Sequence, residues 1–211
     1  EASAYQSGHA NWEWHKAQPA NRVAAMRSGP GDYPVDDKDS PIAVCNFNAV
    51  GGSTVLYSAH CPRFRPPDFE TRTREGIGLD WPLNYETLRD YFNLNEQEMA
   101  VSGLVGDPAY PDIENLLPPV PLGETGTTLA RAFNAKGWHW WPSYAAISTR
   151  ERNGRSACLN LGPCNTGCPQ GAKSSTDVTY LKKAEALGLV LMPNTAVSHV
   201  LVENGRAVGL A

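Results

Sequence analysis

Two adjacent glycines followed by two hydroxyl residues form the motif Gly51, Gly52, Ser53 and Thr54. Glycine lets the backbone approach a ligand closely, and the N–H groups of such a bend can bind a diphosphate. A glycine turn that only joins two structural elements would have the same sequence. The motif by itself leaves both interpretations open.

Three of the five cysteines are close in sequence, at Cys158, Cys164 and Cys168, and Pro169 follows the last of them. Thiolates are natural ligands of iron–sulfur clusters. A structural disulfide, or plain thiols packed beneath a loop, would give the same sequence. Zinc is disfavoured because no fourth ligand lies at a recognised spacing. The cysteines therefore predict a local site whose chemistry stays open.

Three tryptophans and a histidine are crowded into the string GWHWWPSY, at Trp138, His139, Trp140 and Trp141. Aromatic faces stack on sugar rings and also fill protein cores, and we favour the core for these side chains. A separate histidine, His60, can equally be a hydrogen-bonded loop residue or part of a site.

Two helices are predicted from the spacing of apolar residues, at residues 84–98 and 127–136. Gly137 should end the second helix, and the proline-rich residues 113–126 should connect the two regions. The buried stripe of the first helix would consist of Tyr85, Leu88, Tyr91 and Phe92. In the second helix, Leu129, Ala132 and Phe133 would share one face.

The last part of the chain predicts a helix, a strand and a hairpin. Residues 174–176 can cap a helix that stops at Gly188. The pair Asn204 and Gly205 favours a two-residue type I′ turn between two strands. The expected strands are residues 189–192, 196–202 and 207–210.

The composition narrows the class of protein. With 211 residues, 41% hydrophobic content, 17 prolines and 19 glycines, the chain can bury a core and should be rich in loops. A net charge of -4 without a Lys or Arg run argues against nucleic acid as a partner. No apolar stretch approaches the roughly 20 residues of a membrane-spanning helix. We therefore expect a soluble segment, cytoplasmic or periplasmic, with no membrane span.

Several unrelated strings follow one another along the chain. GGST at residues 51–54 precedes RFRPPDF at 63–69 and GLDWPLNY at 78–85. The strings VSGLVGDP, CNTGCPQGAKSS and NTAVSHVLVENGRAVGL come later. This order resembles the glucose-methanol-choline (GMC) family of flavoprotein oxidoreductases over nearly the whole chain.

The resemblance implies an α/β or α+β fold. Part of an FAD-binding, Rossmann-like domain would be interleaved with part of a substrate domain built on antiparallel sheet. We expect residues 1–80 to belong to the FAD-binding domain and to include the flavin-contacting loop. Residues 81–168 would belong to the substrate domain and its connecting loops, and residues 169–211 to the FAD-binding domain again.

The resemblance also implies which residues contact FAD. Gly51, Gly52, Ser53 and Thr54 would line its diphosphate and ribityl region, Ser58, Ala59 and His60 would approach the isoalloxazine ring, and the backbone of Val197 would contact the adenine. Some relatives attach FAD covalently through a histidine at the position of Leu56. An aliphatic side chain cannot form that bond, so we expect non-covalent FAD.

The implied activity is that of an FAD-dependent dehydrogenase or oxidase. It would oxidise an alcohol, polyol or sugar hydroxyl by hydride transfer to the flavin. Cys158, Cys164 and Cys168 resemble the motif by which some sugar dehydrogenases of the family hold an iron–sulfur cluster. One alternative is thus an electron-transfer sugar dehydrogenase subunit that passes electrons through the cluster to a haem partner. The other is a non-catalytic binding or structural module.

Two parts of the implied enzyme have no counterpart in the sequence. No G-x-G-x-x-G follows a predicted strand, and the catalytic histidine of the family would come after Ala211. We therefore assign no catalytic residue to this chain. It should be one part of a longer polypeptide or of a split enzyme, with the remainder or a companion subunit as its partner.

Overall fold

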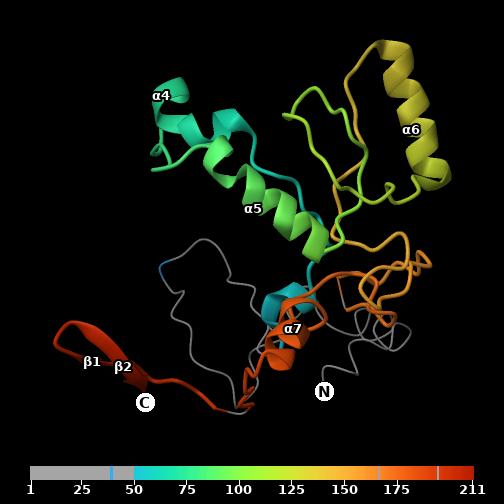
Figure 1. Ribbon diagram of the computed structural model, residues 1–211. Coiled ribbons are helices and arrows are strands. Elements are labelled where there is room, and N and C mark those ends of the chain that lie inside the picture. Colours follow the sequence, from blue (N-terminus) through green and yellow to red (C-terminus); the bar gives the residue numbers. More distant parts are fainter. Residues whose placement is uncertain (1–38, 40–49, 166, 194) are drawn as a thin grey trace.

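The computed structural model describes Asp39 and residues 50–165, 167–193 and 195–211 (Figure 1). The described part combines short helices with a two-stranded antiparallel sheet. Its elements are the 3-10 helices η1 (Gly52–Val55) and η2 (Pro66–Glu70), the helices α4 (Thr71–Glu75), α5 (Tyr85–Glu98), α6 (Gly123–Lys136) and α7 (Tyr180–Ala186), and the strands β1 (Val200–Glu203) and β2 (Arg206–Leu210).

Helix α5 confirms the prediction for residues 84–98. Asn84 is its N-cap, and the Asn84 side-chain oxygen accepts a 3.0 Å hydrogen bond from the N–H of Thr87. Of the predicted stripe, Tyr85 is buried, whereas Tyr91 is 68% exposed. The expected burial of Tyr91 is therefore wrong for the described part of the protein.

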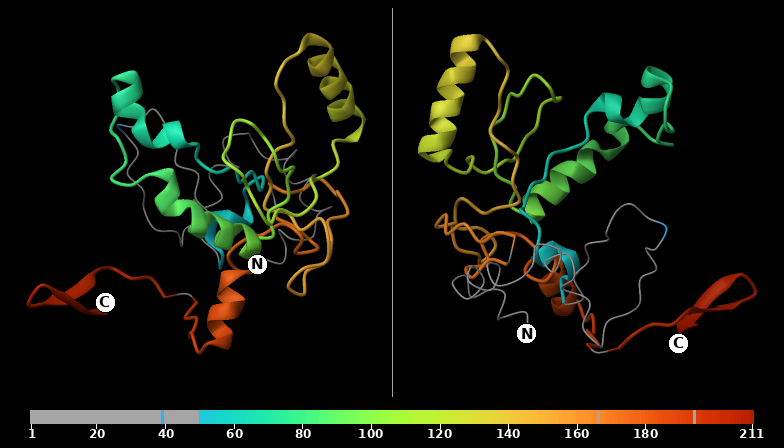
Figure 2. Two further views of the ribbon diagram at one scale, coloured as in Figure 1. Left: turned by 45° about the horizontal axis from the view of Figure 1, so that its top comes forward. Right: turned by 180° about the vertical axis from the view of Figure 1, so that it is seen from behind.

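Helix α6 begins earlier than predicted, at Gly123, and ends as predicted at Gly137, whose φ is 66°. Leu122 is its N-cap residue, and the proline-rich connection ends just before it at Pro121. Of the three residues on the predicted face, Leu129 and Ala132 are exposed and Phe133 is half-buried. Leu129 is 50% exposed and Ala130 is the buried residue, because α6 stands apart from the other helices (Figure 2).

The predicted cap at residues 174–176 and the strand at residues 189–192 are not formed. Helix α7 starts at Tyr180, and the hydroxyl of Ser174 instead donates to the carbonyl oxygen of Met99. Residues 189–192 are exposed, and no described segment pairs with them as a strand. A strand requires such a partner for its backbone groups, which explains the error.

The hairpin and its turn are confirmed, although the first strand begins at Val200 rather than at residue 196. Asn204 and Gly205 have φ values of 49° and 75°, as a type I′ turn requires. Glu203 and Arg206 form the first pair of residues beside this turn. The register of the two strands shifts between Leu201 and Val202. Every residue of β1 is exposed, and the hairpin projects away from the helices (Figure 1).

The core forms where extended segments meet. The N–H of Ala146 donates to the carbonyl oxygen of Ala59 at 2.8 Å, and the N–H of Ser174 donates to that of Ala146 at 2.8 Å. Ser102 and Ala145 exchange backbone hydrogen bonds of 2.7 and 2.9 Å. The two buried clusters contain Met99, Val101, Ile113, Tyr144 and Ala146, and Ala59, Ala145 and Ile147.

The mixed composition of helices and antiparallel sheet agrees with the expected fold class in outline. The Rossmann-like fold, its interleaving with a substrate domain and the domain boundaries stay predictions. None of the described helices is long and apolar enough to cross a membrane.

Candidate functional site

The chain turns sharply at Gly51 and Gly52, whose φ values are 90° and 55°. We call residues 51–57 the glycine bend. A Cβ atom at Gly51 would lie 2.7 Å from Oδ1 of Asp177 and 2.9 Å from Cγ2 of Val55. Both the left-handed backbone and the close packing therefore require glycine at this position. Ser53, in contrast, is an exposed residue.

Thr54 joins the glycine bend to the segment before α7. Its hydroxyl donates to the carbonyl oxygen of Gly51 at 2.5 Å, and its Oγ1 accepts a 3.1 Å hydrogen bond from the N–H of Thr176. The hydroxyl of Thr176 donates to the same Gly51 carbonyl at 3.2 Å. As a result, η1 and α7 lie side by side (Figures 1 and 2).

Lys173 supports the glycine bend from behind. It is 3% exposed, and its Nζ donates to the carbonyl oxygens of Val55, Tyr57 and Thr54 at 2.7, 3.0 and 3.3 Å. Nζ also lies 4.7 Å from the centroid of the Tyr57 ring, within range of a cation–π interaction. Burial lowers the pKa of Lys173 to about 8. The sequence prediction missed this residue.

The three residues that follow the glycine bend, residues 58–60, alternate between the surface and the core. Ser58 and His60 are exposed, whereas Ala59 is fully buried. Nδ1 of His60 lies 2.6 Å from the hydroxyl of Ser143, which identifies a hydrogen-bonded histidine in a loop segment. Seven of the eight predicted FAD contacts, at residues 51–54 and 58–60, thus share one continuous stretch of chain.

Val197, the eighth predicted contact, is 53% exposed. It lies in the extended segment that leads into β1, and the hairpin projects away from η1 (Figure 1). No hydrogen bond among the described residues joins Val197 to the glycine bend, so its contact with adenine stays a prediction.

Arg63 anchors the chain that leaves the glycine bend. Its Nε donates to the carboxylate of Glu96 at 2.6 Å, and both side chains are nearly fully buried. The guanidinium also donates to the hydroxyl of Tyr85 at 2.9 Å and to Oδ1 of Asn93 at 2.6 Å. In the sequence, Arg63 was noted only as the first residue of the motif RFRPPDF, and its hydrogen bonds with α5 were not predicted.

The three clustered cysteines line one small cavity of about 40 Å³, together with Val120 and Ile147. Burial raises the pKa of the Cys164 thiol, and the neighbouring thiols Cys158 and Cys168 raise it further. The described cysteines are all free, so the disulfide interpretation fails for them.

Metal binding by the cysteines is not supported by their arrangement. No group of three or more His, Cys, Asp or Glu side chains within the described ranges is placed to hold a metal ion. Backbone N–H groups instead donate to two of the sulfurs, from Asn160 to Cys158 at 3.3 Å and from Lys173 to Cys168 at 3.4 Å.

The tryptophan string only partly belongs to the core. Trp138 is 63% exposed, so the core interpretation is wrong for this side chain in the described structure. Trp141 does pack against the core, and its indole N–H donates to the carbonyl oxygen of Leu104 at 2.7 Å. His139 stacks on Trp141 and places Nε2 at 3.1 Å from the buried carboxylate of Asp107.

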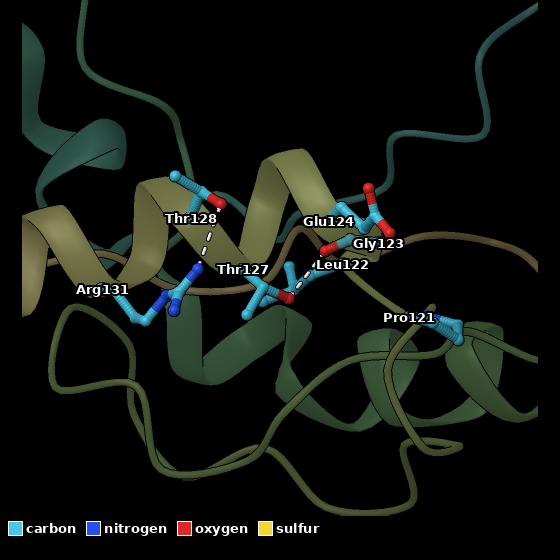
Figure 3. A pocket seen from close by; sticks show the side chains of 7 residues that line it. All are labelled: Pro121, Leu122, Gly123, Glu124, Thr127, Thr128 and Arg131. Carbon is cyan, nitrogen blue, oxygen red and sulfur yellow. Dashed lines mark hydrogen bonds between the residues drawn. The ribbon is translucent and has the colours of Figure 1, made fainter.

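A wider hollow of about 620 Å³ lies at the start of α6 and contains none of the predicted site residues (Figure 3). Two local hydrogen bonds shape it, from Thr127 to the carbonyl of Gly123 at 2.6 Å and from Arg131 to Thr128 at 3.3 Å. Its residues offer no arrangement of groups for redox chemistry, so the glycine bend remains the candidate site.

Comparison with known proteins identifies the family. Residues 129–211 match the family model described as GMC oxidoreductase. The chain is 40% identical over 205 residues to the 2-methyl-1,2-propanediol dehydrogenase of Mycolicibacterium austroafricanum. This alignment covers 95% of this chain and 37% of that protein. This chain belongs to the GMC oxidoreductase family. The glycine bend lies before residues 129–211, which the family model matches. It lies within the alignment to the 2-methyl-1,2-propanediol dehydrogenase, which covers 95% of this chain.

Two further relatives of this GMC oxidoreductase carry different names. The fructose dehydrogenase large subunit of Gluconobacter japonicus is 31% identical over 155 residues, covering 72% of this chain and 28% of that protein. The cholesterol oxidase of Acinetobacter baumannii is 27% identical over 165 residues, covering 77% and 29%. The chain spans about a third of the length of these three relatives. Membership supports FAD as the cofactor at the level of the family.

Proposed function

We propose that the protein is an FAD-dependent oxidoreductase that oxidises a hydroxyl group of an alcohol, polyol or sugar. The observation that carries this proposal is the glycine bend, which packs on residues 173–177 behind and keeps Ser53 exposed in front. The names of the relatives, a diol dehydrogenase, a fructose dehydrogenase subunit and a cholesterol oxidase, agree with a hydroxyl substrate.

The described residues fit a flavin nucleotide at the glycine bend. Oδ1 of Asp177 is buried without a hydrogen-bond partner, directly behind Gly51. A Cβ at Gly51 would push into this oxygen, so glycine at this position lets the bend pack closely on Asp177. Exposed N–H groups of such a bend suit a diphosphate.

Each predicted contact then has a proposed role. Gly51, Gly52, Ser53 and Thr54 would hold the diphosphate and ribityl region, Ser58, Ala59 and His60 would lie along the isoalloxazine ring, and the backbone of Val197 would contact adenine. Bound FAD would supply the hydride acceptor. Leu56 offers no nucleophile, so we propose non-covalent binding at this position.

A second candidate is an electron-transfer sugar dehydrogenase in which Cys158, Cys164 and Cys168 hold an iron–sulfur cluster and a haem protein accepts the electrons. The three thiols line one small cavity, and the name of one relative, a fructose dehydrogenase large subunit, agrees with a sugar substrate and a companion subunit. The thiols would have to move together to form a ligand set, since they do not form one here. Iron and acid-labile sulfide analysis of the full-length protein distinguishes this candidate from the first.

The proposal is tested with the full-length protein under anaerobic conditions. Purified protein should show the absorbance of oxidised flavin, and acid precipitation should release the flavin because it is not covalently bound. Addition of 2-methyl-1,2-propanediol, fructose or another hydroxyl compound should bleach the absorbance. Protein that binds no flavin, or whose flavin no hydroxyl compound reduces, would refute the proposed function.

A further inference from the structure

Lys173 is a buried cation that the proposed chemistry does not use directly. Its ammonium has three N–H donors, and the carbonyl oxygens of Val55, Tyr57 and Thr54 accept from it. The hydroxyl of Tyr57 donates to the carbonyl of Ser174 at 2.8 Å, which fixes the aromatic ring over the ammonium. Lys173 is therefore bound from several sides and excluded from water.

The direction of these carbonyls determines the direction of the neighbouring N–H groups. The peptide bonds are all trans in the described chain, so the C=O and N–H of one peptide unit point to opposite sides. The carbonyl of Tyr57 points to Lys173, and the N–H of Ser58 belongs to the same peptide unit. The N–H of Ser58 therefore points away from Lys173, and Ser58 itself is an exposed residue.

A cation bound to a peptide carbonyl also polarises that peptide. Its N–H becomes a stronger hydrogen-bond donor, because hydrogen bonds in a chain polarise one another in a low dielectric. Lys173 thus acts on the Ser58 N–H in two ways, by fixing its direction and by raising its donor strength.

We propose that Lys173 is the positioning residue for the Ser58 N–H, which it holds toward the flavin ring as a polarised donor. This inference rests on the proposed function, since it assumes that the ring lies on the exposed side of Ser58. A strengthened donor at the ring favours the more electron-rich, reduced flavin, and Lys173 should therefore raise the reduction potential of the bound cofactor.

The test compares Lys173→Met with Lys183→Met in the full-length protein. Methionine keeps an unbranched side chain but removes all three donors. Lys183 is a suitable control because it is 53% exposed and pairs with Glu98 at the surface of α7. Flavin affinity, the reduction potential of bound flavin, and hydrogen exchange of the peptide that spans residues 54–60 in the apoprotein are measured for each variant.

In Lys173→Met, amide exchange in residues 54–60 should accelerate by about tenfold or more, as expected for the loss of about 1.4 kcal/mol of local stability. Flavin affinity and reduction potential should both fall. Lys183→Met should leave all three unchanged. If Lys173→Met does not fold, Lys173→Arg replaces it, because a planar guanidinium keeps the charge but cannot converge on three carbonyls, and a smaller change of the same sign is expected.

Faster exchange with an unchanged reduction potential would overturn the positioning role and leave Lys173 as a structural residue. Unchanged exchange would overturn it as well. If the wild-type protein binds no flavin, the proposed function fails, whereas the exchange measurement still reports whether Lys173 holds the glycine bend.

Discussion

The backbone N–H of Thr176 donates a 3.1 Å hydrogen bond to the side-chain oxygen of Thr54, which lies 122 residues earlier in the chain. This contact joins two motifs that are separate in sequence, GGST and GAKSST. Because Thr54 also holds the carbonyl of Gly51, a single hydroxyl connects the glycine bend with the segment that carries Lys173.

The first prediction concerns this hydroxyl. Thr54→Val preserves the shape of the side chain but leaves the N–H of Thr176 without its acceptor, so the free energy of unfolding should fall by about 1–3 kcal/mol. Flavin affinity should fall with it. Thr127→Val is the control, since its hydroxyl bonds an exposed carbonyl at the start of α6. Equal losses in the two variants, measured by urea unfolding, would contradict a special role for Thr54.

Gly51→Ala should abolish flavin binding, whereas Gly205→Ala should not. Both glycines have positive φ, and alanine costs about 1–2 kcal/mol in that conformation at either position. Only Gly51 has an atom, Oδ1 of Asp177, at 2.7 Å from the new Cβ, while the space around Gly205 is open. Titration of the apoproteins with FAD measures the difference. Normal FAD affinity in Gly51→Ala would argue against the glycine bend as the binding site.

The buried ion pair of Arg63 and Glu96 should matter much more than the exposed pair of Arg74 and Glu70. Arg63→Met leaves a buried carboxylate without its partner, which typically costs about 3–5 kcal/mol. Arg74→Met removes a surface pair worth about 0–1 kcal/mol. Denaturant unfolding of both variants tests this ordering. A loss below about 1 kcal/mol in Arg63→Met would show that Glu96 finds other donors or becomes protonated.

The stability contribution of Lys173 should depend on pH. Burial lowers its pKa from 10.5 to about 8 in the folded protein. Between these values the unfolded chain binds more protons at this residue than the folded chain, so the contribution to the free energy of unfolding increases as the pH rises through this window. Below about pH 8 it is constant, and the total change is at most about 3 kcal/mol.

Flavin affinity should change in the opposite direction over the same window. A neutral amine has only two N–H donors for three carbonyls, so the glycine bend loses one of its hydrogen bonds above about pH 8.

The pH dependence of stability is measured as the free energy of unfolding of the wild type and of Lys173→Met at about pH 7 and about pH 10, and the difference between the two proteins isolates the contribution of Lys173. A constant difference between the two proteins would show that the pKa of Lys173 is not lowered.

Local sequence signals predicted part of the local structure. Asn84 and the apolar spacing gave the bounds of α5, and Asn204 with Gly205 gave the hairpin turn, because capping and turn preferences act over a few residues. Residues 189–192 were wrongly predicted as a strand because apolar character alone cannot show whether a pairing partner exists.

The candidate site was only partly accessible from sequence. The glycine motif identified the bend, but the acceptors of Lys173 lie 116 to 119 residues before it, and no short motif relates positions that far apart. The same holds for Arg63 and Glu96, which meet only because α5 folds back over the chain that leaves the bend. The placement of Val197 relative to a nucleotide stays a prediction for the same reason.

The central claim is that the backbone at Gly51 to Thr54 lies against a flavin nucleotide. An experimental structure of the full-length protein with bound FAD tests it most directly. We predict the diphosphate within hydrogen-bonding distance of the backbone N–H groups of these residues, on the side opposite Lys173. FAD bound at full occupancy elsewhere, with the glycine bend facing solvent or other protein, would contradict the account.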